Sequence, residues 1–187
     1  MSRKLEHAVQ GLLDKQEITE VLLRFCRGCD RFDLQLLESV YWPEATDDHG
    51  AYVGSAITFA KSVCDTQSIY DGLSHKISPP FIKLSGDTAE VETYFLCMVL
   101  HNERYEMGAA NYMIGGRYVD LFERREGVWK ILNRVVIWDW NLKNGVKSDW
   151  GHMKVPKDGK YGGPMATDPS YFPWPEKKAD GSTSFDE

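Results

Sequence analysis

The sequence VLLRFCRGCDRFD, residues 21–33, carries the pattern around which the fold can be worked out. Its apolar residues recur at spacings of three and four, as on one buried face of a helix. Asp30 follows Cys29 directly, so its carboxylate lies beside that apolar face. Because an unpaired charge at the edge of a core is costly, we expect Asp30 to have a partner, and His75 is the best candidate. A helix-capping or solvent-facing role for Asp30 is the structural alternative.

Helical patterns fill the first part of the chain. One long helix, or two in tandem, is predicted over residues 4–31, with a first apolar stripe of Leu5, Val9, Leu12 and Leu13. A short helix is predicted over 33–41, capped by Asp33 and stopped by Pro43, and a third over 55–70, capped by Ser55. Between them, residues 45–54 (ATDDHGAYVG) are predicted to form a short strand between turns, with Asp48, His49 and Gly50 at the tip.

Strand patterns fill the second part, from residue 74 onward. Two strands joined by the turn SGDT are predicted first, then strands over 111–124 and 128–140 joined by a tight turn. Both faces of the strand that contains Phe95 become apolar toward its end, so we expect both to be covered. The predicted fold class is α+β, a cone-shaped barrel with N-terminal helices on a strongly curved, mostly antiparallel sheet that encloses a pocket.

Length and composition suggest one domain over residues 1–140 and a tail over 141–187. The tail is rich in Gly, Pro, Asp and Lys but holds scattered aromatic residues, so we expect it to pack on the domain or on a neighbouring subunit. A net charge of −6 and the lack of a basic stripe argue against nucleic acid as a partner. No apolar run is long enough for a membrane helix, and the N-terminus is too polar for a signal peptide.

Four cysteines are present, and two of them, Cys26 and Cys29, form a single CxxC on the predicted helix. A zinc site needs four ligands at suitable spacing, so we expect free buried thiols and no metal. Free thiols fit a cytoplasmic protein.

The glycine-rich strand adds a motif, G-G-R-Y-x-D-x-F-x-R-x-x-G-x-W-K-I, which starts at Gly115. Together with a helix-end Asp and a His at the start of the sheet, this motif resembles the SnoaL-like branch of the nuclear transport factor 2-like superfamily, over about residues 8–140. The matching residues are Asp30, His75, Gly115, Gly116, Arg117, Tyr118, Asp120, Arg124, Gly127, Trp129 and Ile131.

Within that branch the chain looks most like the group of scytalone dehydratase, hexachlorocyclohexane dehydrochlorinase and bile-acid dehydratase. The resemblance implies a pocket between helices and sheet, with Asp30 and His75 as an Asp–His dyad. His101 matches a second pocket histidine one strand later. The chain departs from the group at Cys29, where a tyrosine would precede the Asp, and its water-activating tyrosine has Tyr41 and Tyr52 as candidates, with His49 nearest that position.

The dyad suits proton abstraction without a cofactor. A neutral imidazole is a base near neutral pH, and a carboxylate at its Nδ1–H fixes the tautomer. His101, Tyr41, Tyr52, Arg27, Trp138 and His49 are the candidate substrate-binding residues. Most have structural alternatives: Arg27 could pair with Asp30, His101 could be a core histidine, and His49 could belong to a turn. Arg117 and Asp120 belong to the sheet motif, and we expect them to form structural pairs with opposite charges on adjacent strands.

The resulting function is a cofactor-independent lyase of the dehydratase type, acting on an aromatic or polycyclic small molecule. Three alternatives stay open: a formaldehyde-eliminating C–C lyase of lignin-derived diarylpropanes, a ketosteroid-type isomerase or polyketide cyclase, and a non-catalytic binding or assembly subunit. A homodimer or homotrimer is expected, because the curved sheets of the superfamily often pack outer face to outer face.

Overall fold

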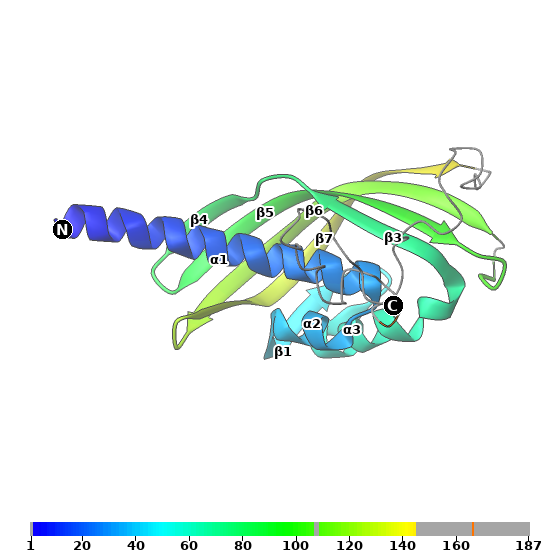
Figure 1. The fold of residues 1–187 in the computed structure, drawn as a ribbon, viewed down its shortest axis with the longest axis horizontal. Coiled ribbons are helices and arrows are strands. Elements are labelled where there is room, and N and C mark those ends of the chain that lie inside the picture. Colours follow the sequence, from blue (N-terminus) through cyan, green and yellow to red (C-terminus); the bar gives the residue numbers. More distant parts are fainter. Residues whose placement is uncertain (1, 107–108, 145–165, 167–187) are drawn as a thin grey trace, which may run out of the picture.

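The computed structural model describes residues 2–106, 109–144 and 166 (Figure 1). The aromatic residues of the predicted tail lie outside these residues, and so does His152. None of the helices in the described part is long and apolar enough to span a membrane.

In the part of the chain that the structure describes, three α-helices form the first layer. Helix α1 (Arg3–Arg31) is a single helix that begins after Ser2 and ends at Phe32, whose positive φ of 54° turns the chain. Helix α2 (Leu34–Ser39) follows, with the Asp33 carboxylate accepting a 2.9 Å hydrogen bond from the Leu36 amide. Helix α3 (Ala56–Asp65) starts after Ser55 and is followed by the short 3-10 helix η1 (Gln67–Ile69). The predicted caps at Asp33 and Ser55 are confirmed.

Two predicted helix ends were wrong. Helix α2 ends before Pro43, which lies inside the first strand. Helix α3 ends at Asp65, because the Thr66 hydroxyl donates to the Val63 carbonyl and the chain leaves the helix there. The first apolar stripe of α1 is exposed in the single chain, and the N-terminal end of the helix extends beyond the sheet (Figure 1).

The strands form one sheet in the order β2-β1-β7-β6-β5-β3, with β4 paired to β5. Its strands are β1 (Tyr41–Asp48), β2 (Val53–Ser55), β3 (Tyr70–Ile77), β4 (Phe81–Ser85), β5 (Thr88–His101), β6 (Ala110–Arg125) and β7 (Val128–Asn144). Among the strand pairs of the described residues, only β1–β7 is parallel. The predicted single strand before the SGDT turn is two, β3 and β4, because Pro79 and Pro80 interrupt it.

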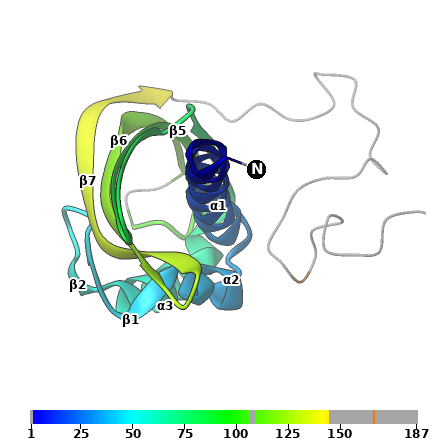
Figure 2. The ribbon, with the colours of Figure 1, turned by 90° about the vertical axis from the view of Figure 1, so that its left-hand side faces the viewer.

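The α+β class and the helices on a curved, mostly antiparallel sheet are confirmed, but the sheet does not close into a barrel. In the described residues, β2 and β3 are the ends of the strand order. Helix α1 lies along the concave side of the sheet and covers it (Figure 2).

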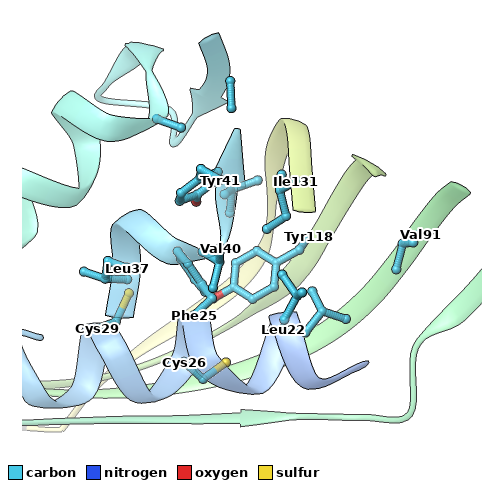
Figure 3. Close-up of a cluster of buried hydrophobic side chains, with 14 of the residues drawn as sticks. Leu22, Phe25, Cys26, Cys29, Leu37, Val40, Tyr41, Val91, Tyr118 and Ile131 are labelled. Atoms are coloured by element: carbon cyan, nitrogen blue, oxygen red, sulfur yellow. The ribbon is translucent and has the colours of Figure 1, made fainter. Parts of the chain in front are cut away.

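The core fills the space between α1 and the concave side of the sheet (Figure 3). Phe25 of α1 packs edge-on against Tyr118 of β6, with ring centroids 5.5 Å apart, and Tyr118 stacks on Phe95 of β5 at 4.4 Å. The opposite face of β5 is partly exposed, with Tyr94 and Met98 at 57% and 40%. The prediction that both faces are covered is therefore wrong for the single chain.

Candidate active site

Asp30 and His75 meet where the last turn of α1 crosses β3. The Asp30 Oδ1 atom lies 2.6 Å from His75 Nδ1, and the His75 backbone amide donates to both carboxylate oxygens at 3.0 Å. Each side chain is 12% exposed. A carboxylate only accepts hydrogen bonds, so Nδ1 carries the proton and, in the neutral ring, Nε2 carries the lone pair. The structure thus joins the two residues that the sequence singled out.

The electrostatics of the pair favour a charged imidazolium. Burial alone acts to lower the pKa of His75, but the hydrogen bond with Asp30, assisted by Cys97, outweighs burial and raises the pKa from 6.5 to about 10. The neutral form of His75 is therefore a strong base, and this form becomes abundant only at alkaline pH.

Cys97 is a neighbour of the dyad that the sequence did not reveal. It lies directly opposite His75 in the β3–β5 pairing and is buried. The alternation of β5 places Cys97 on the core face, but only the register between β3 and β5 brings it beside His75. The two thiols of α1 are kept protonated, because burial raises the pKa of Cys26 to about 12 and that of Cys29 well above its usual range. In the described residues no three His, Cys, Asp or Glu side chains gather as around a metal ion.

A second Asp–His pair lies at the end of β1. His49 Nδ1 is 2.7 Å from Asp47 Oδ1, and the Tyr41 hydroxyl donates to Asp47 Oδ2 at 2.7 Å. Asp47 is fully buried and the His49 side chain is 18% exposed. Tyr41 is itself buried, so it would reach a bound molecule only through Asp47 and His49.

Two of the candidate residues outside these pairs are Tyr52 and Arg27. Tyr52 donates its hydroxyl to the Ser55 carbonyl at 2.8 Å, in the turn before α3. Arg27 is exposed on α1, and the Asp30 carboxylate that it was suggested to pair with is held by His75.

The remaining histidine candidate, His101, lies in a separate aromatic cluster. Its ring stacks on Tyr105 at 3.9 Å and lies 4.8 Å from Tyr70, and burial lowers its pKa. His101 is four positions along β5 from Cys97, the partner of His75, which is about 13 Å along a strand. The structure therefore does not bring His101 to the dyad. Its cluster adjoins a hollow of about 1060 Å³ that Tyr70 and Asn102 help to line.

Trp138 joins the second pair to the core. Its ring meets His49 edge-on at 5.8 Å and Phe95 at 6.0 Å, and nearly half of its surface, 48%, is exposed. Trp138 also lines a smaller hollow of about 350 Å³ with Tyr112 and Ile114. A register shift in β7 opposite Gly115 and Gly116 places Trp138 there, which the sequence alone could not specify.

Arg117 and Asp120 each pair with an opposite charge on the adjacent strand β7, as expected of structural charges, and they do not pair with each other. The two residues are three positions apart on one strand, so they point to opposite faces of the sheet. Asp120 instead holds the buried Arg134 through two 2.8 Å hydrogen bonds, while Arg117 pairs with Asp139 at 3.2 Å.

Comparison with known proteins gives one family match and several similar folds. A family model described as a SnoaL-like domain matches residues 10–135. No curated protein matches the chain. A crystal structure of hexachlorocyclohexane dehydrochlorinase LinA type 2 has a TM-score of 0.68 at 17% identity, covering 81% of this chain and 99% of its own.

Two further crystal structures agree. The LinA-type3 dehydrochlorinase of Novosphingobium barchaimii has a TM-score of 0.64 at 18% identity, covering 76% of this chain and 99% of its own. A protein assigned as a scytalone dehydratase from Novosphingobium aromaticivorans has a TM-score of 0.65 at 15% identity, covering 75% of this chain and 94% of its own. At such identities the similarity shows the shared fold and leaves the reaction to be argued from the site.

Proposed function

Because the chain belongs to the SnoaL-like domain family, we propose that it is a cofactor-independent lyase that eliminates water or a similar small group from an aromatic small molecule. His75 takes a proton from a carbon next to an activating group. The electron pair of that C–H bond forms the new double bond, and the leaving group departs with the electrons of its own bond. Asp30 stabilises the imidazolium that forms.

The observation that carries this proposal is the three-point hold of Asp30 on His75. The backbone bonds fix the position of the residue and the Nδ1 bond fixes the tautomer, so Nε2 is left as the proton acceptor. Such an arrangement needs no metal or organic cofactor to generate a base. The dehydrochlorinase and dehydratase folds among the similar structures support elimination as the reaction class.

The same contacts weigh against an isomerase of the ketosteroid type. That reaction would use a carboxylate as the base, whereas the Asp30 carboxylate already accepts three hydrogen bonds from His75. With its oxygens engaged in this way, Asp30 is poorly placed to take a proton from a substrate carbon. A carbon–carbon lyase that releases formaldehyde would use the same base. It can be distinguished from a dehydratase only by identifying the product.

A product-release assay tests the proposal. Wild type, His75→Gln and the control His7→Gln, which changes an exposed histidine of α1, are incubated with hydroxylated aromatic compounds and diarylpropane diols. Ultraviolet absorbance and formaldehyde are followed together. We expect new absorbance without formaldehyde in wild type and His7→Gln, and its loss in His75→Gln. Formaldehyde that depends on His75 would indicate the C–C lyase, and normal turnover by His75→Gln would refute the proposed base.

A further inference from the structure

We propose that Tyr41, Asp47 and His49 form a second binding centre that accepts a hydrogen bond from a phenolic hydroxyl of the substrate. This inference rests on the proposed function and narrows its substrate class. The substrate would be an aromatic molecule that carries a hydroxyl remote from the carbon at which His75 acts.

A buried chain of hydrogen bonds links Tyr41, Asp47 and His49. Asp47 is fully buried, yet each of its carboxylate oxygens has a donor at 2.7 Å, the Tyr41 hydroxyl on one and His49 Nδ1 on the other. A buried carboxylate held from both sides has one orientation, and it holds the imidazole in one orientation too. Turn histidines that only face solvent need no such support, so the arrangement indicates a positioned functional group.

The tautomer of His49 makes its free ring nitrogen a hydrogen-bond acceptor. Since Asp47 accepts from Nδ1–H, the neutral His49 ring presents Nε2 as a hydrogen-bond acceptor. In the described residues, Nε2 makes no hydrogen bond, and the His49 side chain is 18% exposed, so a small molecule can approach it. An acceptor selects a partner with an O–H group over one whose oxygen is methylated.

Aromatic side chains lie against the His49 ring. This ring stacks on Phe59 with centroids 4.1 Å apart and meets the edge of Trp138 at 5.8 Å. Trp138 is half exposed and lines the hollow of about 350 Å³, so a flat ring can lie against it while its hydroxyl points at His49.

The position of that hollow connects the two histidine centres. Ile114 lines it and pairs with Cys97, which in turn pairs with His75. Directly paired residues share one face of a sheet, so the hollow adjoins Ile114 on the side that holds His75, on the order of 10 Å or two strands away. Trp138, at the other edge of the hollow, contacts His49. A molecule seated there would lie between the two histidines.

Isothermal titration calorimetry with 2-naphthol and its methyl ether, 2-methoxynaphthalene, tests the inference without needing turnover. Wild type and the control His7→Gln are expected to bind the phenol about tenfold more tightly than the ether, as one well-formed hydrogen bond gives. His49→Phe, which keeps a ring against Phe59, should bind both equally. His49→Asn, whose side-chain amide can still donate to Asp47, keeps the test valid if the first variant does not fold.

Several outcomes would overturn the inference. They are equal or undetectable binding of the two probes by wild type, a preference for the phenol that survives both His49 variants, or a preference that His75→Gln abolishes. Binding by His75→Gln also separates the two proposals. A phenol preference that persists there together with normal turnover by His75→Gln would leave the second centre standing and the proposed base refuted.

Discussion

The carboxylate of Asp30 holds His75 by its ring and its backbone together, with one 2.6 Å contact to Nδ1 and two 3.0 Å bonds from the amide. This double hold connects the end of α1 to β3, so the base is positioned by the packing of helix on sheet. The charge state of the ring then depends on Asp30, and this dependence can be measured.

The first prediction concerns the pKa of His75. Because the hydrogen bond with Asp30 raises that pKa to about 10, the His75 ring should stay protonated between pH 5.5 and 8 in the free protein. Asp30→Asn removes the charge that holds the proton, so the midpoint should fall to near or below 6.5. Histidine titration by NMR, with His75→Gln to assign the signal among the five histidines, measures both values. A wild-type midpoint near 6.5 would contradict the prediction.

Kinetics should follow the same equilibrium once a substrate is found. The neutral ring is the base, so kcat/KM of wild type should rise with pH above 7. Asp30→Asn should reduce kcat by about 10³-fold or more, since a triad carboxylate replaced by an amide has an effect of that order.

Stability should depend on pH through the same group, which is the second prediction. A histidine whose pKa is raised by folding adds stability that is complete below pH 6.5 and is lost as the pH rises through about 10. The difference in unfolding free energy between wild type and His75→Gln should therefore shrink from pH 6 to pH 10. Urea denaturation at several pH values measures it, with the exposed His7→Gln expected to show no such trend. A difference that stays constant over this range would show that the His75 pKa is not raised by folding.

The dyad was within reach of sequence reasoning for a physical reason. Helical spacing placed Asp30 at the edge of an apolar face. Because a buried carboxylate requires a partner, a histidine such as His75 was the expected partner. The family motif around Gly115 and Gly116 then indicated the curved sheet that could bring His75 to it. The α+β class follows from the same change of period along the chain.

The second centre could not be predicted in this way. His49 lies in the sequence DDHG, which is typical of a turn, and Asp47 differs from Asp48 only in the direction that its side chain takes along β1. The burial of Asp47 and its bond from Tyr41 depend on β1 joining β7 in parallel, a pairing between segments far apart in the chain. The neighbourhood of Cys97 likewise depends on strand register, and the position of Trp138 on an irregularity of β7.

The third prediction concerns Arg134 and Asp120, which face each other on β7 and β6 and are fully buried. Arg134→Met leaves the Asp120 carboxylate buried without its cation, and breaking a buried pair typically costs about 3–5 kcal/mol. The control is Arg117→Met, which breaks the partly exposed pair with Asp139 and should cost much less, because solvent screens such a pair. Urea denaturation compares the two variants. Equal losses would show that burial does not set the strength of these pairs.

The fourth prediction tests the glycine motif. A Cβ at Gly116 would meet the Ile137 carbonyl oxygen and lie 2.8 Å from the Phe95 ring, so Gly116→Ala must displace the backbone of β7 or the core. Overpacking of this kind costs about 1–3 kcal/mol. At Gly72 of β3 the nearest atom to an added Cβ is 3.9 Å away, so Gly72→Ala should be neutral or slightly stabilising. If Gly116→Ala unfolds at the same urea concentration as Gly72→Ala, the close approach of β6 to β7 does not require glycine. The motif would then mark the family without supporting the curvature on which both histidine centres depend.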